Sequence, residues 1–489
     1  MTRNVELADH TESEVSKRQG GGDSLASVSR DTLYMVSGQV FSKVFSFAYI
    51  LLLARHLSVE DFGRFNLIMS FVLIAEIAAD FGLSRLMMKD MARREDVIPK
   101  YLGALLPLKI PLSIIAYGGM LLVLWLTGYS IDILQLAAIA GVCLLPSGLA
   151  MAFDNTLHAR QKFHYLATTQ IFLAFSQLVL GGVTLYLTAK LSYVLVVMIL
   201  SYICYLCLLY FFTLKNDYKY TLHWDWRFCR KILHQSFPYM IIAILYIFAA
   251  RAEMLMLSQL VTDAVIGIYS AASKIPEAAI FVPMMFTSVL GPILSRLHED
   301  SKEGLTKLYG WSSRAIVLAM VPCAFIGILL AEPIFLFLFS EKYAESIPVL
   351  KTILLVFPLT SLYILNSTVM YTSDHQIQSM VVFLLLTVIQ YTLNYFLINA
   401  RGLDGAMDAF VFSTVINAAV TTLLVRLWFI NRIVVFALCP PLVASAVLTL
   451  SYFYFPIDNV VIKPLLALIL FGLCAYVLWH LMPTRFETE

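Results

Sequence analysis

Charged side chains inside long apolar segments are the groups in this chain whose types and spacing suggest chemistry. Lys43 lies on the first such segment with Gln39 and Ser46, at i, i+4 and i+7, which places all three on one face of a helix. The seventh and eighth segments carry Arg251 and Lys274. An ion inside a bilayer is costly unless it faces protein, a partner or water. The three cations therefore predict a shared, wet and largely cationic cavity.

Carboxylates share these segments with the cations. Glu76 and Asp80 lie one helical turn apart on the second segment, and Glu277 lies on the eighth, directly after Pro276. Such carboxylates are candidates for carrying a coupling proton or sodium ion. The alternative is that these groups only form ion pairs between helices, such as Lys43 with Glu76, Arg251 with Glu277, or Arg85 with the Glu76 and Asp80 pair.

A structural role is the simpler interpretation for several other polar residues. Arg251 and Glu253 are only two residues apart, so they point in different directions on a helix, and at least one needs a partner elsewhere. Lys109 lies near the start of the third segment, where its long stem can reach the membrane surface. Cys204 and Cys207 lie in the middle of an apolar segment, so we expect core packing there and neither metal nor redox chemistry.

The segments that position these side chains are expected to be transmembrane helices. Hydrophobic residues make up 60% and charged residues 13% of the 489-residue chain, against about a quarter charged in a soluble domain. This composition excludes a water-soluble enzyme and predicts an all-α polytopic membrane protein with about fourteen spans, each able to cross a ~30 Å hydrocarbon layer. The expected spans are 33–54, 65–84, 101–125, 133–153, 164–188, 193–213, 236–260, 264–291, 311–330, 349–370, 379–399, 405–425, 433–454 and 463–481.

The distribution of basic residues orients these spans. Most of the 34 Lys and Arg residues fall in the tails and in the loops on one side, including the loop with Lys89 and Lys100 and the linker with Arg227. The other side holds only Arg55, Arg64, Lys190, Lys342, Lys351, Arg401 and Lys463. Cytoplasmic loops carry the excess of positive charge, so both termini are expected in the cytoplasm.

A weak internal repeat divides the chain into two halves. The segment Ser58–Phe65 follows the first span and Thr262–Tyr269 follows the seventh, and both re-enter the membrane at a glycine with an aromatic residue two positions later. Six spans per half give both halves the same orientation, related by a pseudo-twofold axis along the membrane normal. The expected parts are a disordered cytoplasmic tail at 1–30, six-helix bundles at 31–213 and 236–430, a cytoplasmic linker at 214–235, and helices 13 and 14 with a C-terminal tail at 431–489.

Several short motifs, in their order along the chain, resemble those of the Wzx-type polysaccharide flippases. They are Leu53–Leu57 with Glu60–Gly63, Asp80–Leu83, Ile266–Lys274, Glu332–Ser340 and Gly402–Ala406. The similarity extends from about residue 33 to residue 430. These flippases belong to the MOP superfamily, which also contains the lipid II flippase and the multidrug and toxin (MATE) exporters. The resemblance implies two six-helix bundles in a V-shaped, alternating-access arrangement in the bacterial inner membrane, and a transporter rather than an enzyme.

The resemblance also implies a cargo, an undecaprenyl pyrophosphate-linked oligosaccharide that is moved to the outer leaflet to build O-antigen, capsule or exopolysaccharide. Lys43, Arg251 and Lys274 are expected to contact its pyrophosphate, because Lys and Arg attract phosphate strongly in a partly desolvated cavity. Glu76, Asp80 and Glu277 are expected to couple transport to an ion. No cofactor and no nucleic acid are expected. The expected partners of a monomeric protein are membrane lipids, a polysaccharide polymerase and a chain-length regulator.

Three other functions compete with this one. A lipid II flippase would also have fourteen spans, but the Asp80–Leu83 motif favours the polysaccharide branch. A MATE-type multidrug exporter usually has twelve spans and an acidic or apolar cavity. A membrane-bound glycosyltransferase would need a phosphate-reading or metal-binding motif in a sizeable loop, and this sequence has no outer loop longer than roughly twenty residues and no nucleotide-binding glycine motif.

Overall fold

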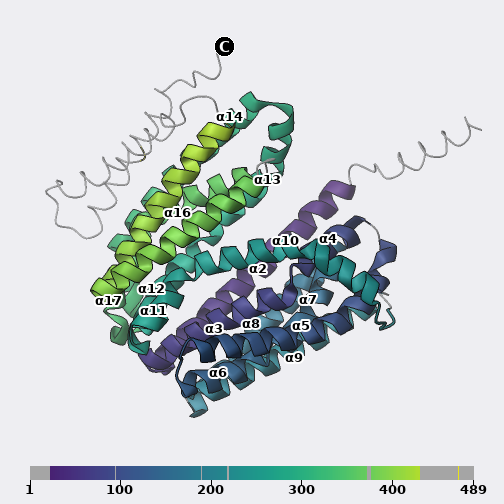
Figure 1. The fold of residues 1–489 in the computed structure, drawn as a ribbon, viewed down its shortest axis with the longest axis horizontal. Helices are drawn as coiled ribbons and strands as arrows, with labels where there is room; N and C mark the ends of the chain where they lie inside the picture. Colours follow the sequence, from purple (N-terminus) through teal and green to yellow (C-terminus); the bar gives the residue numbers. More distant parts are fainter. Residues whose placement is uncertain are drawn as a thin grey trace, which may run out of the picture. The chain divides into compact units, whose positions relative to one another are not determined.

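The computed structural model describes residues 23–93, 95–188, 190–216, 220–371, 376–429 and 472. These residues form helices joined by short turns and contain no strand (Figure 1). The first half of the chain forms α2 (Asp23–His56), α3 (Val59–Asp80), α4 (Leu83–Arg93), η1 (Glu95–Val97), α5 (Ile98–Leu126), α6 (Ile131–Gly141), α7 (Leu144–Ala159), α8 (Phe163–Thr188) and α9 (Leu191–Lys215). The second half forms α10 (Trp226–Ala250), α11 (Ala252–Leu260), α12 (Asp263–Ala279), α13 (Phe281–Asp300), α14 (Lys302–Leu329), α15 (Ala331–Phe339), η2 (Glu341–Tyr343), α16 (Ser346–Tyr371) and α17 (Gln376–Phe429).

Eleven helical stretches of the described part are long and apolar enough to cross a membrane. Each overlaps an expected span, and together they account for the first twelve, because the last stretch, Gln378–Trp428, contains two of them. The largest difference is in the seventh span, which was expected at 236–260 and is found at Trp226–Ala250. Gly402 lies inside that stretch with the non-helical angles φ 58° and ψ −128°, and so marks the turn between the two spans. The expected all-α membrane fold is confirmed. The expected spans 433–454 and 463–481 lie outside the described residues, apart from the single residue 472.

The end of α3 explains the glycine of the sequence motif Asp80–Leu83. α3 ends at Asp80, and the next two residues, Phe81 and Gly82, have the left-handed φ values 53° and 73° before α4 begins. A Cβ atom on Gly82 would lie 2.6 Å from the carbonyl oxygen of Ser236 and 2.8 Å from the backbone nitrogen of Met240. Glycine is required here because the backbone of α10 approaches closely and because φ is positive.

The chain divides into two compact units, and two of the boundaries between them fall inside α3 and α10. Unit 1 comprises Met1–Leu57 and Ile68–Ile244, and unit 2 comprises Ser58–Leu67 and Leu245–Glu489. The first part of α3 therefore belongs to unit 2, while the first part of α10 belongs to unit 1.

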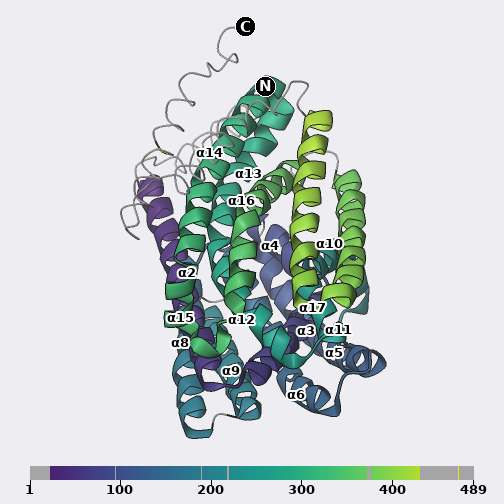
Figure 2. The ribbon, with the colours of Figure 1, turned by 90° about the vertical axis from the view of Figure 1, so that its left-hand side faces the viewer.

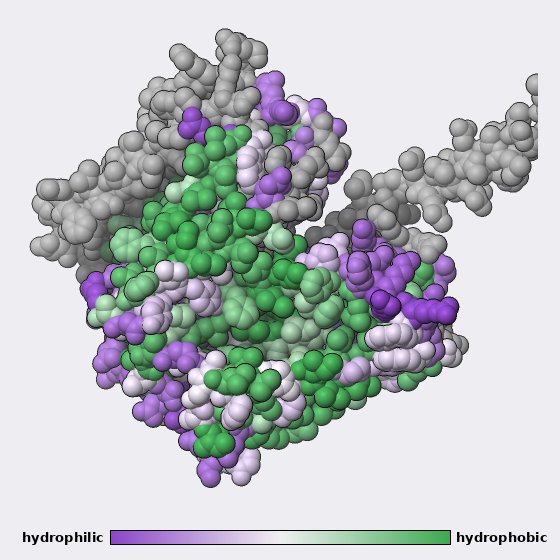
Figure 3. All heavy atoms as spheres, in the orientation of Figure 1, coloured by the Kyte–Doolittle hydropathy of each residue, from purple (hydrophilic) through white to green (hydrophobic). Residues whose placement is uncertain are grey.

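Each unit has its own apolar core. In unit 1, buried side chains of α4, α5, α7 and the start of α10 pack together. In unit 2, the core joins α13, α14, α16 and α17, and Figures 1 and 2 show α14, α16 and α17 running side by side. Large apolar side chains such as Trp125, Tyr186 and Phe337 are nevertheless exposed, and hydrophobic residues cover much of the face in Figure 3. Outward-facing apolar helices are what a bilayer requires.

The two glycine turns of the internal repeat pack directly against each other within unit 2. A Cβ atom on Gly63 would overlap the carbonyl oxygen of Asp263 and lie 2.7 Å from the nitrogen of Gly267. Arg64 Nε also donates a hydrogen bond to Asp263 Oδ2 at 2.7 Å. The N-terminal turns of α3 and α12 are thus held in backbone contact, which only residues without a side chain permit.

Candidate functional site

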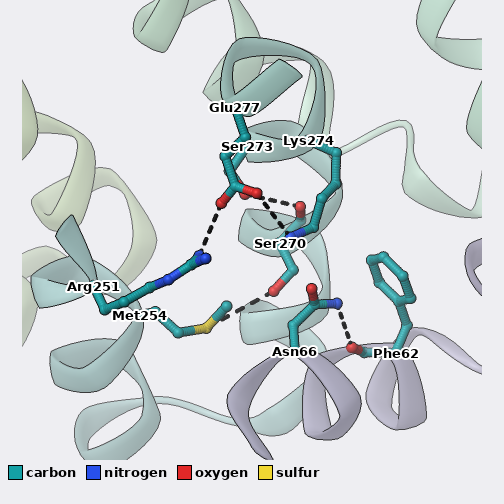
Figure 4. Close-up of polar contacts among 8 residues, drawn as sticks. All are labelled: Phe62, Asn66, Arg251, Met254, Ser270, Ser273, Lys274 and Glu277. Carbon is teal, nitrogen blue, oxygen red and sulfur yellow. Dashed lines mark hydrogen bonds and ion pairs between the residues drawn. The ribbon is translucent and has the colours of Figure 1, made fainter. Parts of the chain in front are cut away.

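Arg251, Lys274 and Glu277 form one ionic cluster in unit 2 (Figure 4). One carboxylate oxygen of Glu277 accepts a hydrogen bond from Arg251 Nη1 at 2.9 Å, and the other accepts one from Lys274 Nζ at 3.1 Å. The exposed fraction of the side chain is 8% for Lys274, 25% for Arg251 and 40% for Glu277. The acid therefore bridges two cations and is the most open member of the three.

Interruptions of the helices position this cluster. Arg251 occupies the break between α10 and α11, with φ −116° and ψ 10°. Lys274 and Glu277 are three residues apart on α12, which makes them neighbours on its surface. Pro276 lies between them and has no backbone N–H to donate to the preceding turn. The helix is therefore weakened where the cluster sits.

Other polar side chains of α3, α11 and α12 lie near the cluster in Figure 4. Ser273 Oγ donates a hydrogen bond to the carbonyl oxygen of Ser270 at 2.9 Å, and Ser270 Oγ contacts the Met254 sulfur at 3.8 Å. Asn66 Nδ2 donates to the carbonyl oxygen of Phe62 at 2.8 Å. These hydroxyl and amide groups thus donate to neighbours of their own.

Glu253 has partners of its own. The Gln390 side-chain amide donates to it at 2.9 Å, and Asn394 is a second amide nearby. Both amides belong to α17, whereas the partner of Arg251 belongs to α12. The expectation that at least one of Arg251 and Glu253 needs a partner elsewhere is confirmed.

The partner of Asp80 in unit 1 is Lys109. Lys109 Nζ contacts Asp80 Oδ1 at 2.6 Å, and the lysine side chain is fully buried. Ser84 donates to Asp80 through its hydroxyl at 2.6 Å and its backbone N–H at 3.3 Å, and Asn155 Nδ2 donates to the Ser84 hydroxyl at 2.7 Å. The expectation that Lys109 reaches the membrane surface is wrong, because this acid neutralises it inside the helix bundle.

Glu76 and Lys43 are the remaining predicted site residues. Glu76 is half-buried on α3 and lies near Ser147, Lys109 and Asp80. Lys43 is exposed on α2, and no ion pair joins it to another residue that the structure describes. Ion pairing of Lys43 with Glu76, one of the structural alternatives, is thus not found in this part of the chain.

Three of the six predicted residues come together in one cluster, and two others form a second. The first cluster is Arg251, Lys274 and Glu277; the second is Glu76 and Asp80 with Lys109. Lys43 belongs to unit 1 and to neither cluster.

The sequence interpretation missed Lys109 and Gln390 as partners. A signal existed for Lys109: it lies eleven residues into α5, which puts it about 16 Å along the helix axis, deeper than a lysine stem can reach back. Gln390 gave no comparable signal, since it meets Glu253 across 137 residues of sequence. One further expectation is wrong. Cys204 and Cys207 do not pack in a core but lie exposed on α9, whose buried positions fall on another face.

Metal binding has no geometric support in the described part of the chain. No group of three or more His, Cys, Asp or Glu side chains that could hold a metal ion occurs there.

Residues 52–348 match the model of a protein family described as polysaccharide biosynthesis protein. No curated protein sequence matches the chain.

The fold is shared with solved transporters. A lipid II flippase, MurJ, in an inward closed conformation is 16% identical, with a TM-score of 0.71 over 92% of this chain and 98% of the other. An inward-facing multidrug resistance MATE transporter of the MOP superfamily is 17% identical, with a TM-score of 0.65 over 79% and 94%. A MOP superfamily transporter from Pyrococcus furiosus is 15% identical, with a TM-score of 0.59 over 83% and 96%. At these identities the likeness establishes the fold alone.

Proposed function

Because the chain belongs to the polysaccharide biosynthesis protein family, we propose that it is a flippase for a polyprenyl pyrophosphate-linked oligosaccharide. The cargo moves from the cytoplasmic to the outer leaflet of the inner membrane, where its sugars join a growing polysaccharide. The lipid tail stays in the bilayer throughout, so the protein has to shelter only the charged and hydrated head.

The observation that carries this proposal is the Arg251 and Lys274 pair. Both cations lie in or beside membrane-spanning helices and point at a shared anion (Figure 4). Arginine presents a planar fork of donors that matches phosphate oxygens, and lysine adds a compact charge. Charge-assisted hydrogen bonds of this kind are about twice as strong as neutral ones. Lys43, exposed on α2, is the third cation that we assign to the head group.

Energy for the cycle has to come from an ion gradient or the membrane potential, since the sequence has no nucleotide-binding motif. Glu76 is the residue that we assign to ion coupling. Asp80 is less suited to this role, because Lys109 and Ser84 already engage its oxygens. A carboxylate that changes charge with the gradient can favour one access state over the other.

Charge reversal tests the head-group site in cells that depend on this protein for polymer export. Lys43→Glu, Arg251→Glu and Lys274→Glu should each abolish export while membrane insertion stays normal, and the neutral Gln variants should weaken export less. Arg251→Lys should retain partial function because a point charge replaces the fork. Lys190→Glu, an equal charge change at an exposed helix N-cap, is the matched control and should have no effect.

Two outcomes would argue against this function. If export survives all three reversals, Lys43, Arg251 and Lys274 do not bind the head group. If export is lost only because the protein is lost from the membrane, the three residues have a structural role in ion pairs. Vesicles that contain lipid II in place of the oligosaccharide lipid compare the two cargoes. If the protein flips lipid II and does not flip the oligosaccharide lipid, lipid II is its substrate.

A further inference from the structure

The cationic site of unit 2 already contains an anion of its own. Each carboxylate oxygen of Glu277 contacts a different cation, Arg251 at 2.9 Å and Lys274 at 3.1 Å (Figure 4). A phosphoryl group offers oxygens of similar spacing and charge, and it would take the same two donors. A pyrophosphate can therefore engage both cations only if the carboxylate gives up its place.

We propose that Glu277 is a displaceable counter-ion that holds the head-group site between transport cycles and leaves it when the pyrophosphate of the cargo binds. This inference rests on the proposed function and adds a competitor built into the binding site. Glu277 is then a positioning residue that changes places with the cargo. The two cations always contact an anion, which is the Glu277 carboxylate between cycles and the pyrophosphate when cargo is bound.

The differences in burial favour movement of the acid and not of the bases. The Glu277 side chain is 40% exposed, whereas Lys274 is 8% exposed and held within α12. Pro276 leaves the adjacent turn of α12 without one backbone hydrogen bond, and the helix ends two residues after Glu277, at Ala279. The carboxylate therefore has room to move while the cations stay in place to receive a ligand.

Exchange solves two problems of an anion carrier. Two cations without a counter-ion in a membrane segment are costly, so an empty site needs an internal anion. A site without a competitor would also bind the pyrophosphate tightly on both sides of the membrane. Competition from Glu277 lowers the affinity and allows release at the outer side.

Binding measurements on the purified full-length chain in detergent test this inference, with farnesyl pyrophosphate as the probe and farnesol as the uncharged reference. Glu277→Gln removes the competitor and should tighten the Kd for farnesyl pyrophosphate by about tenfold or more, while farnesol binding stays unchanged. Glu60→Gln, the same substitution at an exposed position of α3, is the matched control. In reconstituted vesicles the tighter-binding Glu277→Gln protein should flip its cargo more slowly.

Thermal unfolding gives a second readout of the same idea. Without ligand, Glu277→Gln should have a lower Tm than the wild-type protein, since two cations have lost their anion. Farnesyl pyrophosphate should then raise the Tm of the variant more than that of the wild type, because ligand stabilisation grows with affinity.

The outcomes separate this inference from the proposed function. Equal or weaker binding of farnesyl pyrophosphate by Glu277→Gln overturns the displaceable counter-ion and leaves the head-group site standing. Failure of both proteins to bind the probe overturns both. If Glu277→Gln does not fold, Glu277→Asp takes its place: its side chain is one methylene shorter and reaches one cation only, so an intermediate affinity is expected and an unchanged affinity refutes exchange.

Discussion

At the scale of single residues, the Asp80–Lys109 pair combines two charges that neither could bury alone. The lysine is fully enclosed, and the acid has its remaining capacity filled by Ser84. Breaking a buried pair leaves one uncompensated charge, whereas removing both charges often costs little. The pair is therefore interpreted as an element of stability in unit 1.

A double-mutant cycle measures this role. Asp80→Asn and Lys109→Met should each destabilise the protein by about 3–5 kcal/mol, and the double variant by clearly less than the sum. Thermal unfolding in detergent, followed by tryptophan fluorescence, provides the comparison. Additive losses in the double variant would mean that the two side chains act independently.

Glu76 should behave differently from Asp80, although the two are one turn apart. Its neighbours are the neutral Ser147 as well as Lys109 and Asp80, which pair with each other, so Glu76→Gln is expected to leave the protein folded and to uncouple flipping from a proton or sodium gradient. Vesicles loaded with lipid-linked oligosaccharide and given an imposed gradient make the measurement. Gradient-dependent flipping equal to that of wild type would remove Glu76 from the coupling mechanism.

The sequence predicts which charged residues within the spans are important more successfully than it predicts which residues they contact. Lys274 and Glu277 were recognisable because charges are rare in apolar helices and their three-residue spacing is local. The contacts of Asp80 and Glu253 depend on which faces of distant helices meet, and hydropathy does not encode that. The Lys109 contact spans 29 residues and the Gln390 contact 137.

At the scale of elements, the Gly63–Gly267 contact joins the N-terminal turns of α3 and α12. The internal repeat in the sequence pointed to both glycines, but it gave no sign that the two turns touch. Spans were predictable in number and approximate position, with bounds off by up to about ten residues, since length and hydropathy define them. Breaks inside spans, such as Arg251 between α10 and α11, were not, because local apolar composition continues across them.

Substitution of Gly267 tests the contact. A Cβ atom there would overlap the carbonyl oxygen of Val59 and lie 2.9 Å from its carbonyl carbon, so Gly267→Ala should force the two turns apart and lower the Tm markedly. Gly310 in α14 is the matched control, since nothing lies within 4 Å of its added Cβ atom. Gly310→Ala should be neutral or stabilise by up to about 1 kcal/mol through helix propensity. Equal effects at both glycines would show that the close contact is unimportant.

At the scale of the whole molecule, the basic residues predict the orientation in the membrane. Alkaline phosphatase, which is active only outside the cytoplasm, should be inactive when fused at the junction of α4 and α5, within 89–100, or in the linker between the end of α9 at Lys215 and the start of α10 at Trp226. It should be active when fused in the loop at 340–345. Fusions of the reverse pattern would invert the expected topology and place the Arg64–Asp263 contact at the cytoplasmic end of the helices.

The shared helices α3 and α10 have a consequence for a protein made in two pieces. A break in the chain between residues 216 and 220 gives one fragment that carries Ser58–Leu67, which belongs to unit 2, and another that carries Trp226–Ile244, which belongs to unit 1. Each fragment thus supplies a segment that completes the fold of the other. Fragments 1–216 and 220–489, encoded by separate genes in one cell, should copurify through a tag on either one, so the covalent linker would be dispensable for assembly.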